Sequence, residues 1–274
     1  MARLKLVKDV KDVNKTLKEQ IRGFFRKGSR IAVKLHMGEI RNKYYLKPGV
    51  IKGIVSVLKE LGLKPFLFDS VVLYSGARDT KAKYYATAKK HGFAEEKIGC
   101  PIVISDRGVD VKTKNMTVRV CRELAEADGM LVVSHVKGHC CYGFGGAIKN
   151  IGMGGVTPKS KEAIHLAKFG FASSDELLAE AAFAVLKKVP KAYYVNFLIN
   201  IARECDCCND AGPIVADDIG VLFGDDIVAI DQASVDLIYC QKYGIFEKLH
   251  NKDPYLQIKY ARELGLGERR YDIS

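Results

Sequence analysis

The sequence lacks the features that would place the chain in a membrane or outside the cell. No run of apolar residues approaches the roughly 18 that a bilayer-spanning helix needs. Lysine and arginine are frequent in the first 30 residues, where a secretory signal would carry an apolar core. We therefore expect a cytoplasmic protein without a membrane partner, in which thiols remain reduced.

The chain also has few of the residues that separate domains. Only seven of its 274 residues are proline, and no Gly/Ser-rich or low-complexity tract interrupts it. We expect one α/β domain over residues 1–274, or two lobes of about residues 1–160 and 161–274. A chain of this length builds a core without disulfide bonds, so its eight cysteines are expected to have another role.

Basic residues are absent from Glu204 to Asp236, a stretch that contains nine acidic side chains. The first hundred residues have the opposite bias, with 23 basic and 9 acidic side chains. Lysine-rich helices often serve only solubility or stability, and we favour that interpretation. The alternative is that the basic third binds nucleic acid, RNA in particular, through its charge, although no recognisable nucleic-acid-binding motif accompanies it.

Apolar runs rich in valine and isoleucine alternate with segments of helical period. This pattern is typical of a mainly parallel sheet with helices on both faces. The expected strands are Arg30–Leu35, Pro65–Phe68, Ile102–Ser105, Gly129–Ser134, Ala192–Phe197 and Ile219–Phe223. The expected helices are a first one from Pro48 to Gly62, followed by Thr80–His91, Ser174–Lys188, Asp231–Tyr239 and Pro254–Leu264. Ser174 and Asp231 are expected to cap the N-termini of their helices.

Residues 134–150 form a glycine-rich segment directly after an expected strand, the place where open α/β proteins bind ligands. Glycines let the backbone approach an anion closely, and lysines add charge. We predict that this segment holds an anionic substrate or a cofactor phosphate; the alternative is a turn that only packs a strand on a helix. The predicted binding residues are Gly143, Gly145, Gly146, Lys137, Lys149 and Asn150.

The same segment contains His135, His139, Cys140 and Cys141. Imidazole and thiolate groups are ligands for zinc, nickel and iron, so we predict that one of the two histidines ligates a metal or transfers protons. Consecutive side chains of an extended segment point to opposite faces. One of the two cysteines is therefore expected to face a shared centre, and the other to be buried as a small apolar residue.

Three further cysteines fall within four residues, at Cys205, Cys207 and Cys208. In an extended chain Cys205 and Cys207 project to one face and can hold one metal, whereas Asp206 and Cys208 face the other way unless the chain turns. No Cys-x-x-Cys-x-x-Cys spacing occurs, so this is not a standard ferredoxin motif. A fourth ligand is expected from residues 135–141. The alternatives are a redox-sensing thiol pair or inert buried cysteines.

His36 and Glu39 follow the first expected strand. Alternation along the strand places Lys34 and His36 on one side, and His36 with Glu39 then forms a pair suited to acid–base chemistry or metal binding. The alternative is a capped strand end with a structural role.

Several motifs follow one another along the chain: His36-Met-Gly-Glu39, Tyr74-Ser-Gly-Ala-Arg78, His91-Gly-Phe93, His135-Val-Lys-Gly-His139, Gly143-Phe-Gly-Gly-Ala-Ile-Lys-Asn150 with Gly152-Met-Gly154, Cys205-Asp-Cys207, and the segment Asp218 to Asp236. Together they resemble the domain of unknown function 362 family, often labelled iron–sulfur-cluster-binding, over residues from about 30 to 245. The resemblance implies that the histidine and glycine segment and Cys205-Asp-Cys207 form one shared site. Members with two ferredoxin-type clusters carry an inserted module. No such insert lies between Lys168 and Lys191, so those clusters are not expected here.

We interpret the chain as a redox protein or oxidoreductase in which residues 205–208 and 135–150 hold an iron–sulfur cluster or another thiolate-bound metal. The glycine-rich loop would hold an anionic substrate or a cofactor such as flavin, and the partner is that substrate or an electron-transfer protein. One alternative is a non-redox zinc or nickel enzyme with an open coordination position. Another is an RNA-binding or assembly protein that uses the basic N-terminal third. A homo-oligomer is compatible with each.

Overall fold

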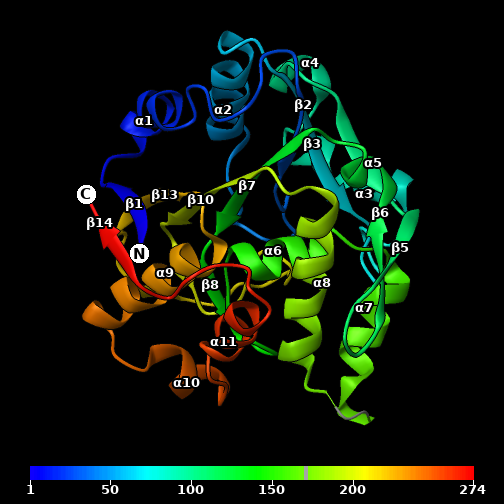
Figure 1. The fold of residues 1–274 in the computed structure, drawn as a ribbon, viewed down its shortest axis with the longest axis vertical. Helices are drawn as coiled ribbons and strands as arrows, with labels where there is room; N and C mark the ends of the chain where they lie inside the picture. The colour runs from blue at the N-terminus through cyan, green and yellow to red at the C-terminus, as the bar shows by residue number, and fades with distance from the viewer. Residues whose placement is uncertain (170–171) are drawn as a thin grey trace.

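The computed structural model describes residues 1–169 and 172–274, and its central feature is an eight-stranded sheet (Figure 1). Five neighbouring strands run parallel, from β10 to β4, while β13 is antiparallel to both of its neighbours. In spatial order the strands are β14 (Tyr271–Ile273), β1 (Ala2–Val7), β13 (Gly220–Gly224), β10 (Ala192–Leu198), β7 (Gly129–His135), β2 (Arg30–Lys34), β3 (Lys64–Ser70) and β4 (Ile102–Ser105).

The predicted α/β class with a mainly parallel sheet is confirmed. All six expected strands belong to this sheet, because their apolar runs are buried on both faces and read as continuous hydrophobic segments. The outer strands β1 and β14 were not expected, and neither were three small hairpins. These are β5 (Gly108–Lys112) with β6 (Thr117–Cys121), β8 (Lys137–His139) with β9 (Gly143–Gly145), and β11 (Ile201–Ala202) with β12 (Ile214–Ala216).

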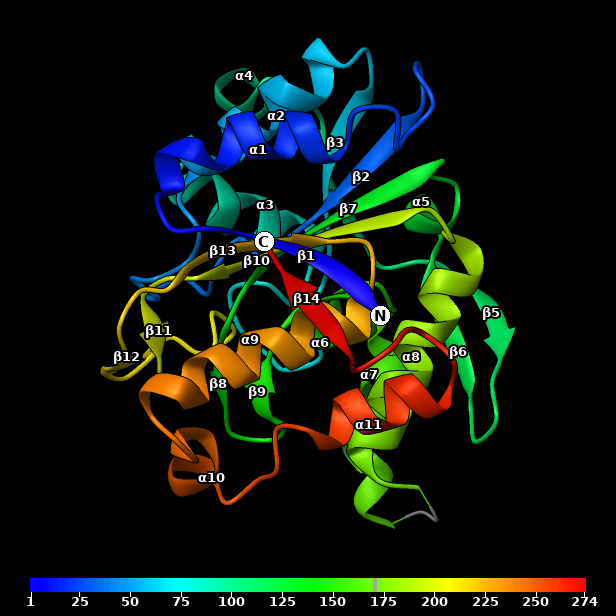
Figure 2. The same ribbon diagram turned by 60° about the vertical axis from the view of Figure 1, so that its left-hand side comes forward.

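One face of the sheet packs against the N-terminal helices (Figure 2). The expected first helix is confirmed with Pro48 in its first turn, and its residues Ile51, Ile54 and Leu58 are fully buried against the sheet. Gly62 follows the helix end with a positive φ of 73°, which glycine adopts without strain. The helices of this layer are α1 (Val13–Gln20), α2 (Pro48–Glu60), α3 (Lys81–Lys90) and α4 (Glu95–Ile98).

The other face packs against the C-terminal helices and the helices of the middle of the chain (Figures 1 and 2). They are α6 (Ala147–Gly154), α7 (Pro158–His165), α8 (Ser174–Lys188), α9 (Ile227–Gln241) and α11 (Leu256–Glu263). The short helices are α5 (Arg122–Ala125), α10 (Ile245–His250) and two 3-10 turns, Val10–Asp12 and Leu166–Phe169.

Two predicted helix caps are wrong by a few residues. Ser173, rather than Ser174, caps α8 by accepting a hydrogen bond from the Glu176 amide. Asp226, rather than Asp231, caps α9 by accepting from the amides of the first turn. Asp231 lies inside the helix and is fully buried, and its carboxylate accepts hydrogen bonds from the first amides of α6 instead.

Strands from both ends of the chain lie side by side in the sheet. β1 pairs with β13 on one side and with β14 on the other, and both termini therefore lie at the same edge (Figure 2). The division into a single domain or two lobes stays a prediction. Within the described residues, no helix is both long enough and apolar enough to cross a membrane.

Candidate metal and anion site

A cavity of about 340 Å³ lies at the carboxyl ends of β2, β3 and β7. Its walls come from the segments after these strands, from α6 and α7, and from the loop 205–208. Ligands of open α/β proteins bind at this edge of the sheet because the loops that follow parallel strands meet there. The two cysteine-containing segments, about 65 residues apart in the sequence, meet in this cavity.

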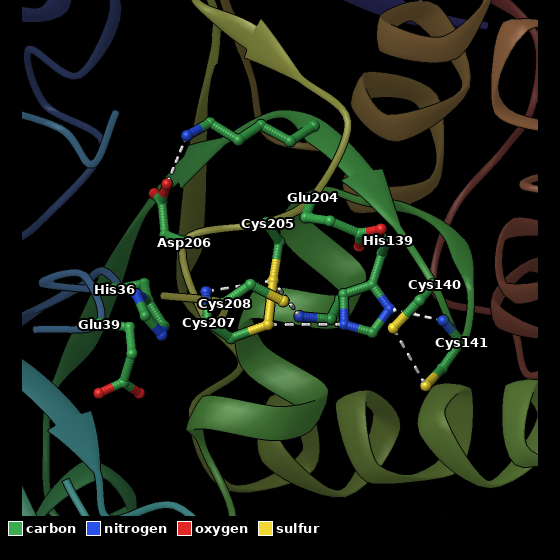
Figure 3. The surroundings of a disulfide bond; sticks show 12 residues. His36, Glu39, His139, Cys140, Cys141, Glu204, Cys205, Asp206, Cys207 and Cys208 are labelled. Carbon is green, nitrogen blue, oxygen red and sulfur yellow. Dashed lines mark hydrogen bonds and ion pairs between the residues drawn. A yellow bond between two sulfur atoms is a disulfide. The ribbon is translucent and has the colours of Figure 1, made fainter. Parts of the chain in front are cut away.

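Cys205 and Cys207 form a disulfide bond in the wall of the cavity (Figure 3). The chain turns at this point, because the Cys208 amide donates to the Cys205 carbonyl at 3.0 Å, and Asn42 Nδ2 donates to the Cys208 carbonyl at 2.8 Å. The turn brings Cys208 to the cavity as well. The expectation that cysteines stay reduced thus does not hold for this pair in the structure.

His139 lies between the disulfide and the Cys140–Cys141 pair (Figure 3). Its Nε2 is 3.6 Å from Cys207 Sγ, and its Nδ1 accepts a hydrogen bond from the Cys141 amide. The ring stacks on Tyr142, with 5.2 Å between the ring centroids. Burial lowers the pKa of His139 well below its usual value, so the ring is neutral at neutral pH.

The prediction that Cys140 and Cys141 point to opposite faces is wrong. Both are exposed, both line the cavity, and their sulfur atoms are 3.7 Å apart. The physical reason is that residues 140–142 form the turn of the β8–β9 hairpin, so the alternation of an extended strand does not apply to them.

Two groups of side chains in the described residues bring three metal-ligating atoms within 4.8 Å of one another. One group is His139, Cys205 and Cys207, and the other is His139, Cys140 and Cys141. Such nitrogen and sulfur donor sets suit zinc, nickel and iron. The site therefore contains Cys/His groups that can bind a metal.

His135 does not belong to these groups. Its Nδ1 is 3.1 Å from Asp206 Oδ2, and its Nε2 is 2.7 Å from the Ile199 carbonyl oxygen, so both ring nitrogens are engaged. Lys137 donates to the other oxygen of Asp206. Burial alone would raise the pKa of Asp206, but the charges of His135 and Lys137 outweigh it and hold this pKa below its usual range. The two residues thus hold the cysteine loop in place through Asp206.

Lys149 projects from α6 to the disulfide, with its Nζ 3.6 Å from Cys205 Sγ. Burial lowers the pKa of Lys149 to about 8. Asn150, the next residue, donates to the Val133 carbonyl and accepts from Lys34 Nζ at 2.6 Å. Asn150 therefore joins α6 to two strand ends, and it also lines the cavity.

Two glycines of residues 143–146 lie where a larger side chain would collide with another part of the protein. Gly143 has φ +70° and packs against the backbone of Pro254, outside the cavity wall. Gly146 caps α6 at its N-terminus, where a side chain would collide with the Asp231 carboxylate. That carboxylate accepts hydrogen bonds from the amides of Ala147 at 2.7 Å and Ile148 at 2.8 Å. The first amides after the glycine-rich segment, which was predicted to bind an anionic ligand, are thus already bound by an anion of the protein.

His36 and Glu39 are joined through Arg78 rather than directly. Arg78 Nη1 is 2.7 Å from His36 Nε2, and Arg78 Nε donates to Glu39 Oε2 at 2.9 Å. Tyr74 also donates to Glu39, at 3.0 Å. Burial and the neighbouring guanidinium lower the pKa of His36 well below its usual value, so it is a neutral group that faces the cavity.

Several residues of the site were not predicted to be functional, among them Asp69, Tyr74, Arg78 and Lys161. Tyr74 and Arg78 appear in the sequence analysis only within a motif that carries the family resemblance. The sequence does contain a signal for Asp69, because it directly follows the apolar run Phe66–Phe68 at the end of β3. In the structure Asp69 is buried. Lys161 had none, because it lies in the polar sequence Lys159-Ser-Lys-Glu162, which is typical of an exposed helix.

A family model described as "Domain of unknown function (DUF362)" matches residues 31–236. The chain belongs to this family. The predicted resemblance is confirmed, and it covers the whole of the site described above. A comparison with curated proteins found no match.

Among solved structures, a protein from Thermotoga maritima is similar, with a TM-score of 0.55 and 13% identity over 93% of this chain. The lactate racemase apoprotein from Thermoanaerobacterium thermosaccharolyticum has a TM-score of 0.49 and 14% identity over 73% of this chain. The chain corresponds to 59% and 51% of the length of these two proteins, respectively. The first similarity supports the α/β fold of this DUF362 protein.

Proposed function

We propose that this DUF362 protein is an enzyme that acts on a small organic anion at a metal held by cysteine thiolates and His139. The observation that carries the proposal is the convergence of the Cys205–Cys208 loop and His139–Cys141 on one cavity that also contains lysine side chains. Sulfur, imidazole and ammonium groups at the end of a parallel sheet are the arrangement that metal-assisted chemistry on an anion needs.

The residues that would hold the metal are His139, Cys205 and Cys207. Thiolates bind metals and disulfides do not, so the disulfide has to be reduced by two electrons, with a dithiol as the reductant, before the metal binds. Three protein ligands leave a coordination position open, as in catalytic zinc sites. The metal would supply a Lewis acid or, if it is iron, an electron acceptor.

The surrounding residues support this role. Lys149 Nζ lies next to Cys205 Sγ and, with a pKa of about 8, can give or take a proton near neutral pH. Neutral His139 can ligate a metal beside Cys207 through Nε2 once the ring proton moves to Nδ1, which now accepts from the Cys141 amide. His135, Lys137 and Asp206 fix the cysteine loop, which keeps the sulfur atoms in place.

Metal analysis of protein prepared without oxygen and treated with dithiothreitol tests the proposal. We expect one metal centre per chain in the wild type, its loss in the double variant Cys205→Ser/Cys207→Ser, and its retention in Cys240→Ser, an exposed cysteine on α9. An unchanged metal content in the double variant would falsify the proposal.

Analysis of the same samples distinguishes an iron–sulfur cluster from a mononuclear metal site. Iron with acid-labile sulfide and an electron paramagnetic resonance signal after reduction would identify an iron–sulfur cluster, for which the cavity offers five cysteines. Colourless protein with zinc, or protein with nickel, would identify the mononuclear form of the proposal.

A further inference from the structure

Five cationic side chains line or border the cavity, and three of them have a carboxylate partner. Lys34 pairs with Asp69 at 3.1 Å, Arg78 with Glu39 at 2.9 Å, and Lys137 with Asp206. The hydrogen-bonding groups of these cations are also largely used, since Lys34 contacts Asn150 and Leu35, and Arg78 contacts His36 and Tyr74. The two cations without a carboxylate partner among the described residues are Lys149 and Lys161.

Lys149 and Lys161 differ in what surrounds them. Lys149 contacts Cys205 Sγ, so reduction of the disulfide gives it a thiolate partner. Lys161 Nζ donates to Ser70 Oγ at 2.9 Å and to the Val71 carbonyl at 2.6 Å, both neutral acceptors. Two of the three N–H groups of the ammonium donate these hydrogen bonds, and the third has no acceptor among the described residues. Lys161 is therefore the cation in this cavity that still needs a counter-ion when the cysteine site is reduced.

The position of Lys161 is costly for a residue without function. Its exposed fraction is only 6%, and a buried ammonium without a counter-ion loses hydration that neutral acceptors restore only in part. Asp69 is the main charge that compensates it, but the two oxygens of Asp69 are already bound by Lys34 and by Tyr84. Buried charges that the protein leaves uncompensated in a cavity are typical of ligand sites.

We propose that Lys161, held in place by Ser70 and Val71, binds the carboxylate of the substrate, which is a small organic acid. The inference rests on the proposed function, because the rest of the substrate then faces the cysteine and histidine end of the same cavity. A volume of about 340 Å³ is at the lower end of small-molecule sites, which suits a molecule of this class.

A carboxylate fits this subsite better than a phosphate. Phosphate sites in α/β proteins use free backbone amides at a helix N-terminus, and the amides of Ala147 and Ile148 that begin α6 are already bound by Asp231. One ammonium with one remaining proton balances a single negative charge. Tyr142 offers a further donor in the cavity, since its buried hydroxyl has no hydrogen-bond partner among the described residues.

Thermal unfolding of the purified full chain with small probes tests the inference. We expect propionate to raise the Tm at neutral pH, and propionamide, phosphate and chloride at the same ionic strength to have no such effect. In Lys161→Met the apparent Kd for propionate should rise at least tenfold, because a charge-assisted hydrogen bond is lost. Lys159→Met, an exposed lysine of the same helix, should behave as the wild type.

Ser70→Ala provides a second variant that keeps the charge and removes one group that positions it. We expect weaker propionate binding in this variant too, by a smaller factor, so the inference stays testable if Lys161→Met does not fold. Unchanged propionate binding in either folded variant, or a response to phosphate instead, would overturn it. Metal content, measured on the same samples, should not change in either variant, which separates this inference from the proposed function.

Discussion

Lys161 is expected to make ligand binding depend on pH. Burial, together with Lys34 and Arg78, lowers its pKa to about 8, while Asp69 and the Cys121 thiol act in the opposite direction. The ammonium is present below this pKa and is lost above it. Propionate binding should therefore be strongest near pH 7 and should weaken as the pH rises through about 8, with a midpoint shifted upward because the bound anion favours the ammonium.

Titration calorimetry with propionate between pH 7 and 10 measures this dependence. Lys149 titrates in the same range, so Lys149→Met is the matched control and should retain the pH profile of the wild type. His165, which also lines the cavity, has a pKa lowered by burial and stays neutral throughout. Affinity that is unchanged at pH 10 would contradict the assignment of the carboxylate to Lys161.

At the scale of the elements, the first turn of α6 determines where Lys149 and Asn150 lie. This turn has no side-chain cap of its own because it begins at Gly146, and Asp231 from α9 supplies the missing acceptor. Asp231 also accepts from Asn196 Nδ2 in β10 at 2.8 Å. One carboxylate thus joins two helices and a strand directly behind the site.

Asp231→Ala should consequently destabilise the fold more than the loss of an ordinary cap. Two buried amides and one side-chain amide lose their acceptor, which should lower the free energy of unfolding by about 2 kcal/mol or more. Ser173→Ala, which removes the exposed cap of α8, is the control and should cost about 1 kcal/mol. Urea denaturation of both variants measures the difference; an equal cost would show that Asp231 is only a local cap.

The elements of the parallel sheet could be predicted because each strand is a short apolar run between helices of clear period. The outer strands β1 and β14 could not, since Arg3 and Lys5 in β1 and Asp272 in β14 interrupt their apolar residues. The candidate site was predictable only in part. Residue type identified the cysteines and His139, but nothing local distinguishes the buried Lys161 from the exposed Lys159.

At the scale of the molecule, the acidic stretch from Glu204 to Asp236 is divided between the surface and the fold. Four of its nine acidic side chains are exposed, and the other five are buried or partly buried. Asp206 pairs with Lys137, and Asp226 and Asp231 accept hydrogen bonds from helix amides. Asp236 accepts from the hydroxyls of Tyr255 and Tyr271, which joins α9 to the C-terminal segments. The less exposed acidic side chains of this stretch therefore serve as acceptors for N–H and O–H donors of the fold.

The sheet connects the two ranges that were predicted as alternative lobes. Strand β1 pairs with both β13 and β14, and β7 pairs with β10, so hydrogen bonds of the central sheet cross from residues 1–160 to residues 161–274 in three places. Separating the ranges would expose the edges of these strands and the apolar residues that both helix layers cover. We therefore expect the whole chain to unfold as one cooperative unit.

Differential scanning calorimetry tests this expectation in the reduced protein, so that disulfide exchange does not complicate the transition. The calorimetric and van't Hoff enthalpies should agree within error. A variant without residues 1–8, which removes β1 and leaves β13 and β14 without their shared neighbour, should lower the Tm of the entire transition rather than of a part of it. Two resolved transitions, of which the truncation shifts only one, would instead show that residues 1–160 and 161–274 are separate lobes.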